Sequence, residues 1–165
     1  MTDFNILSPS HIFFTILCIA IIIYLPRIFV DKTSSSKKTL IFIIISLILV
    51  NQGMDLYREG YMQELKLGLP LHLCDFSSAS IIIYLLTQRR EFFLFAFFAG
   101  ISGAGMAILT PDVLYNFPHI DYVRHMIGHS MILLGVTYAM IIDNQRPELK
   151  DVHRVLFILS ILLFL

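Results

Sequence analysis

The sequence contains no tryptophan, only two cysteines and few charged residues. The cysteines, Cys18 and Cys74, lie far apart and form no framework of paired positions, so no structural disulfide is predicted. Lysine and arginine together number 12, as do aspartate and glutamate, so the formally neutral chain has no basic excess that would attract a nucleic acid. Without tryptophan, anchoring at a membrane surface falls to tyrosine, phenylalanine, lysine and arginine.

Apolar residues dominate the chain instead. They make up 57% of its 165 residues, charged residues make up 15%, and the mean hydropathy is +0.79. Typical soluble domains have roughly 45–50% apolar and about 25% charged residues. The N-terminus carries Asp3 and no basic stretch before the first apolar run, which is unlike a cleaved signal peptide. These features predict an integral membrane protein that forms a single domain over residues 1–165.

Six apolar runs are separated by polar loops. They cover residues 11–30, 39–57, 71–87, 92–109 and 122–142, and the sixth begins near residue 152. A helix needs about 20 apolar residues to cross the hydrocarbon core. The sixth run is still apolar at Leu165, so we expect that the chain is truncated there or that its end packs against neighbours. The predicted fold is therefore all-α: a polytopic transmembrane bundle of six helices, the last incomplete.

Basic residues are shared unevenly between the loops. The first, third and fifth loops, with the ends of their spans, hold Arg27, Lys32, Lys37, Lys38, Arg89, Arg90, Arg146, Lys150 and Arg154. The second and fourth loops hold only Arg58, Lys66 and Arg124. Because cytoplasmic loops carry the excess of lysine and arginine, the distribution predicts a multi-pass protein of the cell membrane with its N-terminus outside.

The third predicted span begins with a histidine, a cysteine and an aspartate within four residues: His72, Cys74 and Asp75. Ionisable groups inside membrane spans are costly, so they are candidates for function. A buried free cysteine usually behaves as a small apolar residue and is inert unless a base or a cation lies beside it. Cys18, between Leu17 and Ile19, fits that description and is given no role, whereas Cys74 is a candidate nucleophile.

Two histidines of the fifth predicted span, His125 and His129, are four residues apart and lie on one helix face. Since the third and fifth spans both enter from the outside, Cys74 and His129 are expected within roughly 6–10 Å of the outer edge. Asn51 and Asp55 share one face near the outer end of the second span and reach the same layer. These groups could equally serve as hydrogen-bonding partners between helices.

Three further polar residues could support such a site. His72 is two residues from Cys74, about 200° around a regular helix, so we expect it to cap the site or orient another group. Asp112 and His119 lie in the fourth loop, where they could be solvated, orient a histidine or receive a lipid headgroup. The histidine pair with Cys74 or His72 would also fit zinc, but no supporting Cys-x-x-Cys or His-Glu-x-x-His pattern is present, so neither a metal nor a cofactor is predicted.

Four short blocks of sequence resemble a known family. They are Pro70-Leu71-His72-Leu73-Cys74, Thr110-Pro111-Asp112, Phe117-Pro118-His119 and Gly128-His129. Over about residues 40–142 the chain is similar to YwaF-like bacterial integral membrane proteins. That group resembles a mammalian family of polytopic phospholipid acyltransferases, in which an intramembrane cysteine and histidine move acyl chains between lipids. A more distant group of intramembrane lipid hydrolases uses a threonine and a histidine in a similar bundle.

The resemblance implies that Cys74 is the nucleophile and His129 its base. The predicted function is acyl transfer through a cysteine thioester, with a membrane phospholipid or lysophospholipid as the partner. Asn51, Asp75 or backbone N–H groups would stabilise the oxyanion, and His125 would orient His129 or hold the headgroup phosphate. The alternatives are an intramembrane lipid hydrolase, a metal-dependent hydrolase, a transporter or receptor that binds its ligand in the same polar layer, and a structural membrane subunit.

Overall fold

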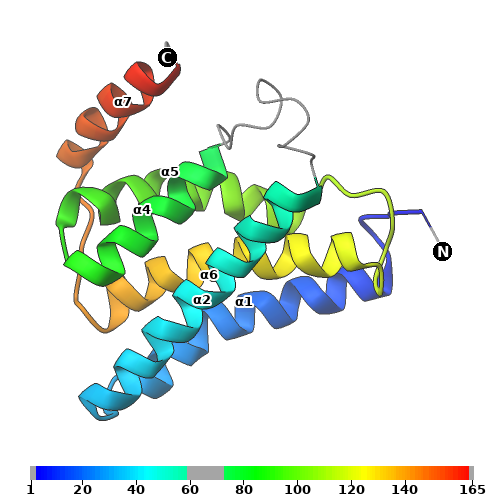
Figure 1. Cartoon of the computed structure of the whole chain (residues 1–165), viewed down its shortest axis with the longest axis horizontal. Helices are drawn as coiled ribbons and strands as arrows, with labels where there is room; N and C mark the ends of the chain where they lie inside the picture. The colour runs from blue at the N-terminus through cyan, green and yellow to red at the C-terminus, as the bar shows by residue number, and fades with distance from the viewer. Residues whose placement is uncertain (1–2, 59–72, 164–165) are drawn as a thin grey trace.

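The computed structural model describes residues 3–58 and 73–163, and these residues form helices joined by short connections (Figure 1). The helices are α1 (Pro9–Phe29), α2 (Ser34–Arg58), α4 (Leu73–Thr87), α5 (Arg90–Leu109), α6 (Ile120–Ile141) and α7 (Leu149–Leu163). Within the described residues there is no strand, and a single isolated bridge pairs Asp3 with Tyr115. Over these described residues the predicted all-α fold with six helices is confirmed. The predicted second loop lies outside the described residues from residue 59 onward.

Several helices begin earlier than their apolar runs, because polar side chains cap them. The Ser8 hydroxyl accepts a hydrogen bond from the backbone N–H of His11 (3.3 Å), and Pro9 occupies the first turn, so α1 begins two residues before the predicted span. In the same way the Thr33 hydroxyl accepts from the N–H of Ser36 (3.3 Å) ahead of α2. Hydropathy marks the part of a helix that meets lipid, whereas the caps lie in the polar layer on either side.

Helix α6 is the centre of the bundle and packs against α1, α2, α4 and α5. Its 22 residues span about 33 Å, enough to cross a hydrocarbon core of about 30 Å. It is nevertheless not among the three described helices that combine sufficient length and hydropathy for a membrane span, which are α1, Ser34–Asp55 of α2 and α5. Because its neighbours shield it, α6 can carry polar side chains toward the interior of the bundle instead of toward lipid.

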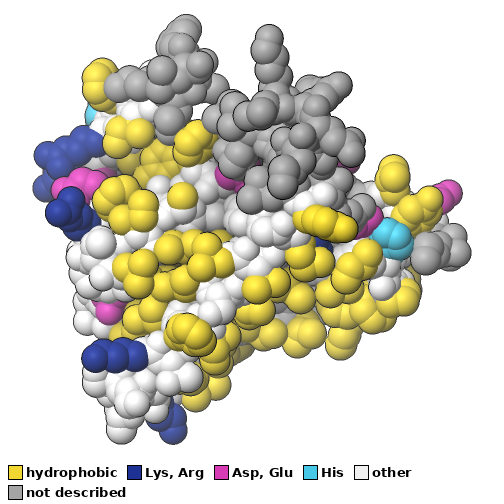
Figure 2. Space-filling view, viewed as in Figure 1, with side chains coloured by type: hydrophobic (Ala, Val, Ile, Leu, Met, Phe, Trp, Pro, Cys, Tyr) yellow, Lys and Arg dark blue, Asp and Glu magenta, His cyan; other side chains and the backbone are white. Residues whose placement is uncertain are grey.

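The bundle has two distinct ends. At one, which we call the N-terminal end, Asn116 of the loop before α6 donates to the Asp3 carbonyl (2.8 Å). At the opposite end, Arg90 pairs with Asp151 (2.7 Å), and Tyr84 donates to Asp143 (3.0 Å). The Lys and Arg side chains visible in Figure 2 gather mainly at this opposite end, and apolar side chains cover much of the face between. This division matches a molecule whose middle contacts lipid.

Candidate functional site

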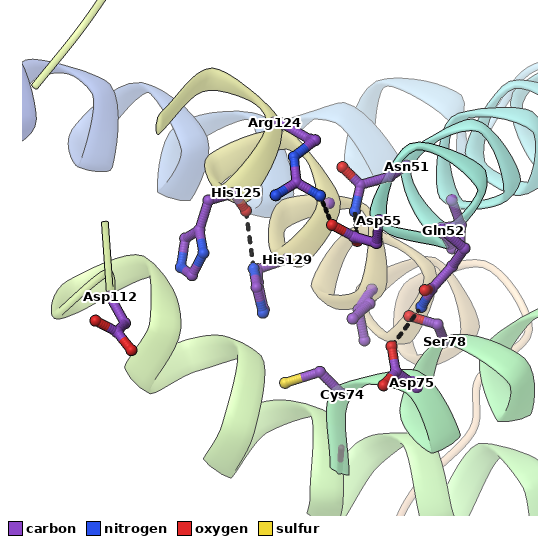
Figure 3. A pocket seen from close by; sticks show the side chains of 13 residues that line it. Asn51, Gln52, Asp55, Cys74, Asp75, Ser78, Asp112, Arg124, His125 and His129 are labelled. Atoms are coloured by element: carbon purple, nitrogen blue, oxygen red, sulfur yellow. Dashed lines mark hydrogen bonds and ion pairs between the residues drawn. The ribbon is translucent and has the colours of Figure 1, made fainter. Parts of the chain in front are cut away.

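A cavity of about 320 Å³ lies toward the N-terminal end, bounded by α2, α4 and α6 (Figure 3). It is lined mostly by polar side chains, with apolar residues on its inner wall. The residues that line it are Ile48, Asn51, Gln52, Asp55, Cys74, Asp75, Ser78, Asp112, Arg124, His125, Gly128, His129 and Ile132. A polar cavity within a bundle this apolar is a site at which a polar part of a ligand could be bound or changed chemically.

Most of the predicted site residues meet in this cavity. Those that line it are Cys74, His129, Asp75, His125, Asn51 and Asp112. His119 is not among the residues that line it; its Nδ1 accepts from the N–H of Asp121 (3.3 Å) and so caps α6. His72 lies outside the described residues.

Cys74 lies in the first turn of α4 and is half-buried, and its sulfur points into the cavity (Figure 3). Gly103 of α5 lies next to the thiol: a Cβ built at Gly103 would be only 3.3 Å from the Cys74 sulfur. The glycine, interpreted from the sequence only as a small residue for helix packing, therefore leaves room for the thiol.

His129 of α6 has a defined protonation pattern. Its Nδ1 is 2.8 Å from the carbonyl oxygen of His125, and a carbonyl can only accept a hydrogen bond, so Nδ1 carries the proton. A neutral imidazole with Nδ1 protonated has its basic lone pair on Nε2. The ring extends from α6 into the same space as the Cys74 thiol (Figure 3). Among the described residues no hydrogen bond joins the two side chains, an arrangement common in a resting catalytic site.

His125 ties the end of α5 to α6. Its Nε2 lies 3.0 Å from the carbonyl oxygen of Ala107, so this nitrogen is the donor. The rings of His125 and His129 are 4.3 Å apart between centroids and tilted by 38°. The two histidines therefore form a stacked pair, with His125 on the side of the bundle end and His129 deeper.

The sequence analysis missed an ion pair at the wall of the cavity. Arg124 of α6 pairs with Asp55 of α2, and Asn51, one turn earlier on α2, donates to the same carboxylate (3.1 Å). Gly128 makes this close approach possible, since any Cβ there would collide with the amide of Asn51. The available signal was one arginine and one aspartate near the same end of two apolar spans, a pairing that the cost of unpaired intramembrane charges favours.

Residues 6–165 match the model of the TMEM164 family. The chain belongs to the TMEM164 family. No curated protein and no solved structure matches it. Family membership and the long apolar helices together identify an integral membrane protein.

In this TMEM164 family member a second hydrogen bond links α2 and α4 at the wall of the cavity. Gln52 of α2 donates to a carboxylate oxygen of Asp75 (3.0 Å). Asp75, predicted as a supporting residue, is thus a link between α2 and α4 as well as a wall of the cavity. In the described part of the chain, no three His, Cys, Asp or Glu side chains lie close enough together to hold a metal ion.

Proposed function

We propose that this protein is an intramembrane acyltransferase that moves phospholipid acyl chains through a thioester on Cys74. The observation that carries the proposal is that the Cys74 thiol and the His129 ring, from different helices, line one cavity. The Nδ1 hydrogen bond to the His125 carbonyl leaves Nε2 of His129 as the base. The resemblance of the surrounding sequence blocks to Cys–His acyltransferases supports the same assignment.

The proposed reaction has two balanced steps. In the first, Nε2 of His129 takes the thiol proton of Cys74, and the thiolate attacks the carbonyl carbon of a phospholipid ester. The C–O bond to glycerol breaks, the alkoxide takes the proton back from His129, and a lysophospholipid leaves. In the second, the hydroxyl of another lysophospholipid gives its proton to His129 and attacks the thioester. The C–S bond breaks, and the sulfur recovers the proton.

The negative oxygen of each tetrahedral intermediate needs donors inside the cavity. Asn51 uses one amide N–H for Asp55 and has a second, which we assign to this role. His125 holds the loop end of α5 and stacks on His129, so it is a positioning residue in this scheme. Asp112, at the exposed rim, would meet the headgroup side of the lipid.

The proposed membrane orientation places the cavity at the outer leaflet. Most basic residues lie at the end of the bundle opposite the cavity, and cytoplasmic ends carry such an excess. The N-terminal end would then be outside the cell membrane. Cys74 would lie just below the headgroups, in the layer that contains the glycerol esters.

The decisive experiment compares Cys74→Ala with Cys18→Ala in purified protein reconstituted in lipid nanodiscs. With a phospholipid carrying a radiolabelled acyl chain, the wild type and Cys18→Ala should acquire label that hydroxylamine releases. Cys74→Ala should acquire none and should transfer no label to an added lysophospholipid. Full transfer by Cys74→Ala would disprove the nucleophile role, and lipid binding without any covalent intermediate in the wild type would favour a binding protein or a transporter.

Lipid hydrolysis is the second candidate. The lining of the cavity is polar and Asp112 at its rim is exposed, so water can enter the cavity and reach the thioester. The first step is unchanged, and water replaces the lysophospholipid as the acceptor in the second. The same assay separates the two activities. Release of free fatty acid that added lysophospholipid does not suppress would establish a hydrolase.

A further inference from the structure

A second hollow, of about 300 Å³, lies between α2 and α4 beside the cavity. We call it the α2–α4 groove. Its apolar walls are Leu49 of α2 and Phe76, Ala79 and Ile82 of α4. It shares Gln52, Asp75 and Ser78 with the polar cavity. The two hollows therefore adjoin at these three residues.

The groove runs along the helices from the cavity toward the middle of the bundle. Chain direction shows this, because α4 proceeds away from the N-terminal end whereas α2 proceeds toward it. Ile82 is seven residues beyond Asp75, about 10 Å deeper, and Leu49 is about one turn deeper than Gln52. The polar members of the groove are thus at its cavity end, and the apolar members extend away from it.

This polarity matches a phospholipid placed in a leaflet. The ester lies near the headgroup layer, and its acyl chain extends toward the centre of the bilayer. If the acyl chain passed through a polar route, each methylene group exposed to water would cost about 0.8 kcal/mol of transfer free energy. The lipid is therefore expected to enter sideways, between the helices. Leu49 is 56% exposed and Ala79 is also exposed, so the groove is open toward the surrounding lipid.

We propose that the α2–α4 groove binds the acyl chain of the phospholipid whose ester is attacked by Cys74, and that Ala79 determines how long a chain fits. This inference rests on the proposed function. The Gln52–Asp75 hydrogen bond joins the two walls where the cavity meets the groove, so the chain passes this bond on its way in. A large side chain at residue 79 shortens the groove without touching the thiol or the histidine.

A neighbouring groove provides the control. It is also apolar, lies between α4, α5 and α7, and is lined in part by Ser80, Phe92, Phe95 and Ile158. Of the residues that line the cavity it contains none. Ser80 follows Ala79 directly on α4 but belongs to this other groove. A phenylalanine at residue 80 therefore adds the same ring to α4 as a phenylalanine at residue 79, but it does not fill the α2–α4 groove.

The experiment measures alkylation of Cys74 on a Cys18→Ala background in nanodiscs, with N-ethylmaleimide and with N-dodecylmaleimide. Both reagents react with the thiol whether or not the protein transfers acyl chains. Ala79→Phe should lower the rate of alkylation by N-dodecylmaleimide about tenfold, because about two methylene groups of the dodecyl chain lose their apolar site. The rate with N-ethylmaleimide should stay within about twofold of the parent rate. Ser80→Phe should leave both rates near those of the parent. Leu49→Phe, on the facing wall, should reproduce the effect of Ala79→Phe and covers the case in which that variant does not fold.

Equal slowing of both reagents by Ala79→Phe and Leu49→Phe, or no slowing, would overturn the proposal. Selective slowing of the dodecyl reagent by Ser80→Phe would also overturn it, since it would place the chain in the other groove. If alkylation depends on chain length but no thioester forms in the nanodisc assay, the groove binds an acyl chain and the acyltransferase proposal is disproved. If a thioester forms but alkylation does not depend on chain length, the acyltransferase proposal stands and the role of the groove is disproved.

Discussion

At the scale of single residues, the site depends on one hydrogen bond that sets the histidine tautomer. The carbonyl of His125 holds the proton of His129 on Nδ1, and so Nε2 faces the cavity as an acceptor. That carbonyl belongs to the helix backbone four residues earlier, so the tautomer is fixed by α6 itself and requires no carboxylate. Cys74 contributes the thiol, and Gly103 contributes only the space beside it.

His129→Ala should lower acyl transfer by about 100-fold or more, because a positioned general base contributes roughly 10²–10⁴. The measurement is the initial rate of transfer to lysophospholipid at neutral pH. His119→Asn is the matched control, since asparagine keeps the cap of α6 and the residue lies outside the cavity. Equal losses in the two variants would contradict the role of His129.

At the scale of elements, close approach of helices depends on small residues in α6. A Cβ at Gly135 would lie 2.5 Å from Cγ1 of Ile81, which is fully buried in α4. Gly128 similarly admits the amide of Asn51 from α2. These two contacts bring α4 and α2 against one helix, and they thereby bring Cys74 and Asn51 to the cavity.

Gly135→Ala should destabilise the protein by about 1–3 kcal/mol, the usual cost of overpacking a core. The measurement is thermal unfolding in detergent followed by circular dichroism. Gly105→Ala on α5 is the matched control: nothing lies within 4 Å of a Cβ there, and replacing a helical glycine is favourable by roughly 0.5–1 kcal/mol. A melting temperature for Gly135→Ala at or above that of Gly105→Ala would show that α4 and α6 do not pack this closely.

At the scale of the whole molecule, the basic end lies opposite the end that holds the polar cavity. The polar cavity lies toward the N-terminal end, whereas Arg90 and Asp151 bind each other at the other end. The hydrogen bond from the N–H of Glu148, together with Arg90, lowers the pKa of the Asp151 carboxyl, so this carboxylate stays charged at neutral pH. Charge thus distinguishes the two ends, which the proposed orientation requires.

Topology can be tested with single cysteines on a background that lacks Cys18 and Cys74. Leu114→Cys, in the exposed loop before α6, should react in intact cells with a membrane-impermeant maleimide. Lys32→Cys, between α1 and α2, should react only after the membrane is permeabilised. The opposite labelling pattern would reverse the orientation and move the cavity to the inner leaflet.

Particular residues show where sequence reasoning succeeded and failed. It predicted that Cys74, His129, Asn51 and Asp55 would lie at one depth, and these four residues line one cavity. It missed the pairing of Arg124 with Asp55, because Arg124 was counted as a loop charge although it belongs to α6. It included His119 among possible supporting residues, but that ring is used by its own helix as a cap, which spacing alone does not reveal.

The sequence by itself determined the membrane class, the helices and the layer that holds the polar groups. These properties depend on residues close together in the chain. Hydropathy over about 20 residues identifies a span, and the direction in which that span crosses the membrane gives the depth of each of its residues. Only the tertiary structure decided which faces meet, which carboxylate the arginine pairs with, and that an apolar groove adjoins the cavity. Those outcomes depend on the rotation and separation of helices, which side chains distant in sequence settle by packing against one another.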